Sequence, residues 1–170
     1  MKKAYILASY RTPGCRAKKG KFKDVRPDDL ATLAIKGLVE RSGIDPATVD
    51  DVYIGCAFPE AEQGMNLGRI AALKAGLPVE VPGQTINRFC SSGLQTIAMA
   101  AERVMLGFDD CIIAGGAESM SSVPMGGLKY SANPGMMVDW PESYSSMGVT
   151  AELVAEQYGI DRAMMDTFAA

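Results

Sequence analysis

The chain has 170 residues, of which 48% are apolar and 22% are charged, so it is long enough to bury a core. Its net charge of −3 excludes a general attraction to nucleic acid or to anionic membranes. It contains no histidine, which excludes Cys-His or Ser-His catalysis within the chain and any metal site built on histidine.

The first apolar run, Ala4 to Ala8, is too short for the core of a signal peptide, and no apolar stretch is long enough to span a bilayer. We therefore expect a soluble, cytoplasmic protein. The four cysteines form no C-x-x-C pair, which indicates free thiols in a reducing compartment.

Strand and helix patterns alternate along the first two thirds of the chain. Helices are predicted between the strands, each ending at a glycine: from Asp28 to Gly43, from Asn66 to Gly76, and from about Ser91 to Gly107. Strands are predicted over residues 4–9, 52–57, 84–87 and 111–114. This order predicts an α/β fold with a mainly parallel sheet and helices on both of its faces.

The third of these helices is apolar on most of its surface, with Leu94, Ile97 and Val104 among its residues. Such a helix is typically buried between two layers, and we expect that here. Its apolar pattern differs from that of the helix beginning at Asp28, where Leu30, Leu33 and Leu38 are predicted to form a single buried face.

The pattern changes after residue 119. Residues 120–148 are rich in Ser, Gly, Pro and Met and lack periodicity, and helices are then predicted from Thr150 and from Asp161. We expect a first domain over residues 1–119 and an irregular excursion from the sheet over residues 120–170.

Cys90 is the strongest candidate for a catalytic residue. It follows a predicted strand and opens a helix, where free backbone N–H groups and the helix dipole favour a thiolate. Such a thiolate can attack a carbonyl carbon while backbone N–H groups stabilise the oxyanion, which is the chemistry of acyl transfer. Position alone leaves a second reading equally open, in which Cys90 is a small buried residue at a tight turn.

Other features carry weaker functional readings. Cys56 and Cys111 lie in apolar strands and are expected to be packing residues. Cys15 lies in a basic loop, where no surrounding motif indicates a catalytic site. Gly115-Gly116 fits a close approach of backbone better than a nucleotide loop. Methionines crowd the irregular segment, where they could line an acyl pocket or simply fill gaps: Met120, Met125, Met136, Met137 and Met147.

Several motifs, in the correct order, resemble those of thiolases. The segment from Asn87 to Gln95 (NRFCSSGLQ) is similar to the acyl-enzyme motif of that family, and Ala114 to Ser121 (AGGAESMS) is similar to the second part of the signature. Arg11-Thr12-Pro13 is similar to the opening of the family, and Met147 to Glu152 is similar to the segment returning from its loop domain. The resemblance covers essentially all 170 residues and implies a thiolase-like half, with residues 120–170 as the start of the loop domain.

The resemblance implies an acyltransferase of fatty acid metabolism that acts on acyl-CoA, with coenzyme A as co-substrate and no bound cofactor or metal. Cys90 would take the acyl group from a 3-ketoacyl-CoA, and Met147 would line the pocket for the acyl or pantetheine end. Ser146 is a histidine in many acetoacetyl-CoA-specific relatives, so the resemblance favours degradative 3-ketoacyl-CoA thiolase over acetyl-CoA acetyltransferase. It also implies a homodimer or tetramer, with dimers paired near Thr85 to Asn87.

The resemblance also implies that the chain is only the N-terminal half of such an enzyme. In thiolases a second half supplies a histidine that activates the nucleophile and a cysteine that moves the substrate proton, and a further strand follows the loop domain. We therefore expect an apolar face that the second half would cover. Two alternatives stay open: a condensing enzyme of the same fold, and a non-catalytic half that binds acyl-CoA or a partner chain.

Overall fold

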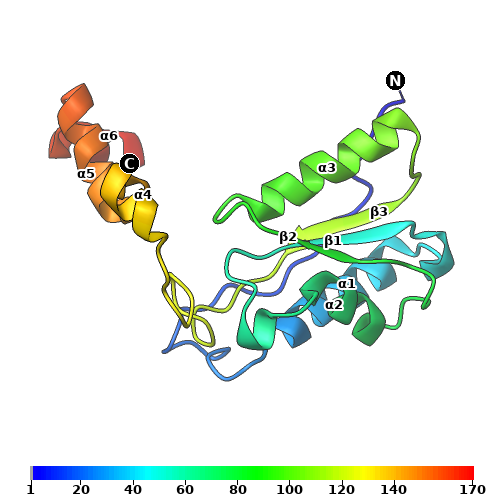
Figure 1. Ribbon diagram of the computed structural model, residues 1–170. Helices are drawn as coiled ribbons and strands as arrows, with labels where there is room; N and C mark the ends of the chain where they lie inside the picture. The colour runs from blue at the N-terminus through cyan, green and yellow to red at the C-terminus, as the bar shows by residue number, and fades with distance from the viewer. Residues whose placement is uncertain (1) are drawn as a thin grey trace. The chain divides into compact units, whose positions relative to one another are not determined.

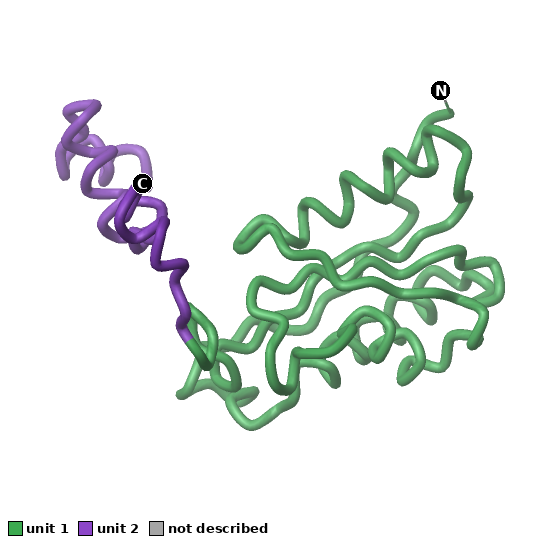
Figure 2. Tube along the Cα trace, viewed as in Figure 1, with its two compact units in different colours: residues 1–129 green, residues 130–170 purple. Residues whose placement is uncertain are grey.

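The computed structural model describes residues 2–170, which form two compact units (Figure 2). The first unit ends at Lys129 and the second begins at Tyr130. The boundary thus lies ten residues after the expected division at residue 119, because residues 120–129 pack with the first unit. Val123 is fully buried there, and its N–H donates to the carbonyl oxygen of Ser119 at 2.9 Å.

A three-stranded parallel sheet forms the centre of the first unit. Its strands are β1 (Asp51–Gly55), β2 (Gln84–Ile86) and β3 (Ile112–Gly116), in the order β2-β1-β3. Ile54 of β1 is in register with Thr85 on one side and with Gly115 on the other. These strands lie within two residues of three of the predicted ones, and all their carboxyl ends meet at one edge of the sheet.

The predicted strand at residues 4–9 is not formed. The segment is extended but pairs with no strand among the described residues, and Ile6 and Leu7 are 80% and 79% exposed. Its start is held by one backbone hydrogen bond, from the Lys2 N–H to the Met105 carbonyl oxygen at 3.0 Å. An apolar run can adopt strand geometry, but it becomes a strand only where a neighbour offers backbone partners.

Helices cover both faces of the sheet, as predicted. In Figure 1, α1 (Pro27–Ser42) and α2 (Leu67–Ala75) lie on one face and α3 (Ser92–Leu106) lies on the other. All three end at glycines in the left-handed conformation, at the predicted positions 43, 76 and 107. The main core lies on the α1/α2 face and includes Ile35, Val52, Ile54, Leu67, Ala71 and Ile113. Two short 3₁₀ helices, η1 (Pro46–Thr48) and η2 (Ala61–Gln63), connect these elements.

Two burial predictions for the helices were wrong. Only Ser92, Thr96 and Ala100 of α3 are buried, because one side of the helix packs on β1 and β3 and no second layer covers its other side within the described residues. On α1 the buried face is centred on Ala31 and Ile35, while Leu33 is 54% exposed.

The second unit consists of short helical segments. Helix α5 (Met147–Tyr158) begins three residues before the predicted Thr150, because the Ser146 hydroxyl caps it by accepting from the Val149 N–H. Helix α6 (Arg162–Ala169) is capped by Asp161 as predicted. The prediction missed α4 (Pro134–Asp139) and the 3₁₀ helix η3 (Pro141–Tyr144), which are too short for a periodic signal. None of the helices in residues 2–170 has the length and apolar character needed to cross a membrane.

Candidate active site around Cys90

Cys90 lies between the end of β2 and the start of α3, and it is exposed. This exposure excludes the reading of Cys90 as a small buried residue. The residue before it, Phe89, has φ +44°, in the left-handed region that a bulky side chain rarely adopts. Such backbone strain persists only where the surroundings enforce it, and it concentrates at functional sites.

Hydrogen bonds to the backbone hold the turn that presents Cys90. The hydroxyl of buried Ser92 accepts from the Arg88 N–H at 2.8 Å and donates to the Phe89 carbonyl oxygen. The Ser91 hydroxyl donates to the Arg88 carbonyl oxygen at 2.9 Å. Both serines after Cys90 therefore stabilise the turn, while the Cys90 side chain is left open to a reactant.

The first turn of α3 lies directly on two glycines of the sheet. A Cβ at Gly55 would stand 2.5 Å from the Ser92 carbonyl carbon and 2.7 Å from the Gly93 nitrogen. A Cβ at Gly116 would stand 3.2 Å from the Gly55 oxygen and 3.5 Å from the Gly93 Cα. The predicted close approach of backbone is thus confirmed at Gly116, but it is wrong for Gly115, where a Cβ would meet nothing within 4 Å.

The other cysteines differ sharply from Cys90. Cys56 is 1% exposed in the core, and burial, reinforced by the Glu118 carboxylate, raises the pKa of its thiol to about 12. Burial and then the charge of Asp50 also raise the pKa of the partly buried Cys111 thiol. Both are packing residues, as predicted. Cys15 is exposed in its loop.

The candidate substrate residue Met147 opens α5 in the second unit and is 63% exposed, whereas Cys90 belongs to the first unit. The methionine cluster is likewise divided: Met120 and Met125 lie in the first unit, and Met136 and Met137 lie in the second. None of the five is buried, so they do not fill gaps within either unit.

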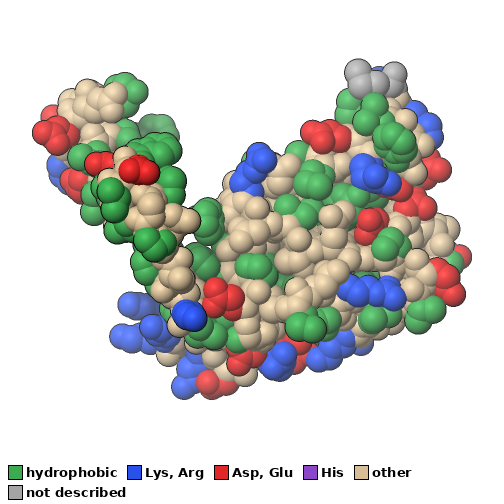
Figure 3. Space-filling view, in the orientation of Figure 1, with side chains coloured by type: hydrophobic (Ala, Val, Ile, Leu, Met, Phe, Trp, Pro, Cys, Tyr) green, Lys and Arg blue, Asp and Glu red, His purple; other side chains and the backbone are tan. Residues whose placement is uncertain are grey.

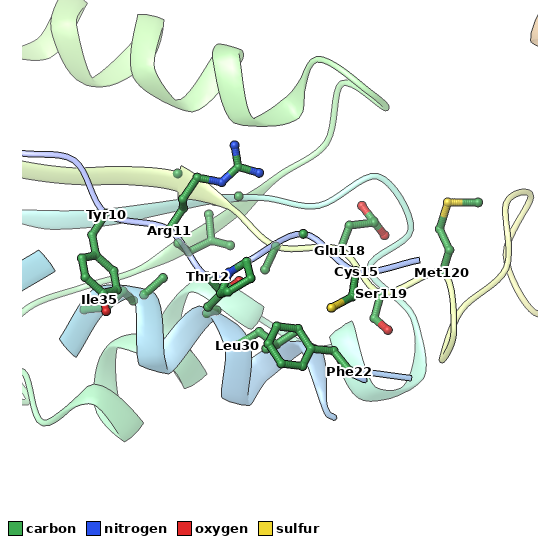
Figure 4. Close-up of a pocket in the computed structure, with 18 of the residues that line it drawn as sticks. Tyr10, Arg11, Thr12, Cys15, Phe22, Leu30, Ile35, Glu118, Ser119 and Met120 are labelled. Carbon is green, nitrogen blue, oxygen red and sulfur yellow. The ribbon is translucent and has the colours of Figure 1, made fainter. Parts of the chain in front are cut away.

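A cavity of about 710 Å³ lies at the edge of the sheet, between α1, β3 and the extended N-terminal segment (Figure 4). Its walls include Tyr10, Cys15, Leu30 and Ile113. Cys90 does not line this cavity, so the two are separate features of the first unit. Glu118, which follows β3, lines the cavity on one side.

Sequence reasoning missed the roles of three residues around the site: Gly55 lies under the first turn of α3, Asn87 accepts from the Phe89 N–H, and Glu118 accepts from the Ala57 N–H. Gly55 could have been found as an isolated glycine in an apolar strand, a signal for close backbone approach. Asn87 and Glu118 lie inside the two quoted motifs, but their roles depend on contacts between loops that follow different strands.

The fold and this site define an α/β protein with an exposed cysteine between a parallel strand and a helix. The sequence model of the family described as "Thiolase, N-terminal domain" matches residues 4–170. The chain therefore belongs to the thiolase family, in agreement with the resemblance seen in its motifs.

Three relatives place the chain within that family. It is 53% identical to a 3-ketoacyl-CoA thiolase of Bacillus subtilis (strain 168), over 99% of this chain and 43% of the relative. It is 42% identical to the peroxisomal 3-ketoacyl-CoA thiolase 5 of Arabidopsis thaliana, over 95% of this chain and 36% of the relative. The crystal structure of the Bacillus anthracis acetyl-CoA acetyltransferase aligns with a TM-score of 0.77 at 36% identity, over 92% of this chain and 42% of that one. The chain thus spans less than half the length of these relatives.

Proposed function

We propose that the chain supplies the nucleophile half of a thiolase, with Cys90 as the residue that accepts the acyl group. The observation that carries this proposal is the exposed Cys90 thiol, which precedes the N-terminus of α3 at the carboxyl edge of a parallel sheet. Ligands of open α/β sheets bind at that edge, and a helix N-terminus stabilises a thiolate.

The reaction that fits this site is thiolytic cleavage of a 3-ketoacyl-CoA. The Cys90 thiolate attacks the C3 carbonyl carbon, the C2–C3 bond breaks, and its electron pair takes a proton at C2, so that acetyl-CoA leaves. The thiol of a second coenzyme A then attacks the acyl-cysteine thioester and releases a shortened acyl-CoA and free Cys90. The resemblance to thiolases implies a histidine as the base that activates Cys90, and in this proposal that histidine lies outside the 170 residues, which contain none.

The names of the relatives favour the degradative reaction, since the proteins from Bacillus subtilis and Arabidopsis thaliana are both 3-ketoacyl-CoA thiolases. In this proposal Met147, exposed at the start of α5, contacts the acyl or pantetheine part of the substrate. Residues 130–170 would belong to the loop domain of the family.

We also propose that the protein acts in the cytoplasm as a homodimer or tetramer. Strand β2 supports the dimer, because among the described residues it is an edge strand of the sheet, and it precedes the Cys90 turn. Pairing of β2 with its copy would bring two Cys90 turns close to one interface.

A mass measurement tests the proposal directly. The chain is mixed with acetoacetyl-CoA and with a longer 3-ketoacyl-CoA, and the intact mass is measured before and after. A single acyl adduct that is absent from Cys90→Ala would support the nucleophile role. If Cys90→Ala binds the same thioesters with unchanged affinity and the unmodified chain forms no adduct, the chain is a binding half, a reading that its lack of histidine favours.

A further inference from the structure

A carboxylate after β3 holds the loop that follows β1. Glu118 Oε2 accepts from the Ala57 N–H at 2.6 Å, in the loop after β1. Its Oε1 accepts from the side-chain amide of Gln63, which is fully buried. Gln63 is itself fixed, since it donates to the Phe58 carbonyl oxygen at 2.8 Å and accepts from the Ser119 N–H at 2.9 Å. Glu118 therefore holds the Ala57 peptide from a defined position.

The next peptide, which carries the Ala57 carbonyl group, leads to the Cys90 turn. The Ala57 carbonyl oxygen accepts from the Asn87 side-chain amide at 2.9 Å. The Asn87 side-chain oxygen in turn accepts from the Phe89 N–H at 2.8 Å. Phe89 is the residue with positive φ that turns the chain into Cys90. Hydrogen bonds to the N–H and to the carbonyl group of Ala57, joined through its Cα, thus connect the Glu118 carboxylate with the backbone immediately before the cysteine.

We propose that Glu118 is a positioning residue for Cys90, acting through the Ala57 peptide and the Asn87 side chain. Each group in the series is oriented by the one before it, and the last of them fixes the strained backbone at Phe89. Without this support Phe89 can relax to negative φ, and the Cys90 thiol then loses its fixed position before the first turn of α3. The inference rests on the proposed function only in taking Cys90 as the nucleophile.

Two single variants of the full chain test the series first by alkylation with iodoacetamide, followed at each cysteine by mass spectrometry. Asn87→Ala removes the last link, and Glu118→Gln places two amide donors, its own and that of Gln63, against each other. We expect each to slow Cys90 alkylation about fivefold, because the thiol no longer keeps its position before the first turn of α3. Alkylation of Cys15 should not change in Asn87→Ala, because Asn87 does not line the cavity that Cys15 and Glu118 share, which makes Cys15 an internal control for that variant.

The double variant and the swapped variant separate positioning from loss of stability. Residues in one series do not act additively, so Asn87→Ala with Glu118→Gln should be no slower than either change alone. Exchange of the two side chains, Gln63→Glu with Glu118→Gln, restores one donor and one acceptor between them but removes the donor to the Phe58 carbonyl oxygen, so it should recover the Cys90 rate only in part. Glu60→Gln is the matched control: its carboxylate also accepts a backbone N–H, that of Leu128, but has no link to Asn87.

Additive losses, or a Cys90 rate equal to that of the unmodified chain in both single variants, would overturn the inference. These outcomes are distinct from failure of the proposed function. If the variants behave as expected but no 3-ketoacyl-CoA acylates Cys90, the series positions a cysteine with another role. If a 3-ketoacyl-CoA acylates Cys90, and Cys90 is alkylated at the normal rate in the variants, the proposed function is supported and the positioning role of Glu118 is wrong.

Discussion

Two cysteines of this chain show how the position of one residue decides its chemistry. Cys56 and Cys90 lie at the carboxyl ends of neighbouring strands, yet Cys56 is 1% exposed and Cys90 is exposed. The difference comes from the turn at Phe89, which directs the chain outward before α3 begins. The motif around Cys90 indicated a nucleophile, but its exposure depends on this turn and on the contacts of Asn87 and Ser92.

The four thiols should therefore react in a fixed order. We expect iodoacetamide at neutral pH to modify Cys90 first, because it is exposed beside a helix N-terminus, and Cys15 second, because it is exposed without such a neighbour. Cys111 and Cys56 should react only when the chain unfolds. Site-resolved mass spectrometry over time checks this order, and equal rates at Cys90 and Cys15 would contradict the activation of Cys90.

Cys56 should also make the protein less stable at alkaline pH. Its thiol has a pKa of about 12 in the folded chain, because of burial and the Glu118 charge, and about 8.5 in an unfolded chain. At a pH between these two pKa values, the Cys56 thiol is deprotonated in the unfolded chain but stays protonated in the folded chain. The free energy of unfolding therefore falls by about 1 kcal/mol per pH unit on account of this group.

Urea titrations at several pH values from 8 to 10.5 measure this contribution. Cys56→Ala should flatten the decline, whereas Cys15→Ala, which changes an exposed thiol, should leave the slope as it is. If the slope in Cys56→Ala is the same as in the unmodified chain, the pKa of the Cys56 thiol does not differ between the folded and unfolded states.

At the scale of elements, the local signals predicted the ends of helices well. Glycines at positions 43, 76 and 107 end α1, α2 and α3, and Asn66 caps α2. These signals are local because capping depends on a few neighbouring residues. The contact between α3 and the sheet could not be predicted in the same way, since it depends on Gly55, which lies 37 residues before Ser92 in the sequence.

A single methyl group at Gly55 should therefore disturb the nucleophile turn. In Gly55→Ala the new Cβ meets the backbone of Ser92 and Gly93 at under 3 Å, so α3 must shift. We expect a loss of about 1–3 kcal/mol in the free energy of unfolding, together with slower alkylation of Cys90. Gly115→Ala is the matched control on the adjacent strand, where a Cβ meets nothing within 4 Å.

Urea unfolding of both variants, with Cys90 alkylation measured on the folded chains, checks this contact. If Gly55→Ala is as stable as Gly115→Ala, the close packing of α3 on β1 is not a constraint on the site.

At the scale of the whole chain, the described residues expose apolar surface, as the resemblance to a thiolase half implies. Figure 3 shows hydrophobic side chains on the face of the first unit along α3, where Leu94 is 71% exposed. The extended segment containing Ile6 and Leu7 is exposed as well. The apolar patterns of α3 and of residues 4–9 predicted burial, and the described residues supply neither a second layer for the helix nor a paired neighbour for the segment. An apolar pattern indicates that a segment can pack against a partner. It does not indicate whether that partner lies in the same 170 residues.

The outer face of α3 should consequently drive association. A contiguous apolar surface exposed to water favours contact with another such surface, and Leu94 and Ile97 lie one helical turn apart on this face. We expect the chain to self-associate with rising concentration, and Leu94→Lys with Ile97→Lys to reduce that association in sedimentation velocity experiments. Leu33→Lys, which changes an exposed leucine on α1 across the sheet, is the matched control and should leave association unchanged. Association that persists in the α3 variant would instead point to another surface, of which the free edge of β2 is the first to test, because a strand edge can pair with its own copy without any apolar contact.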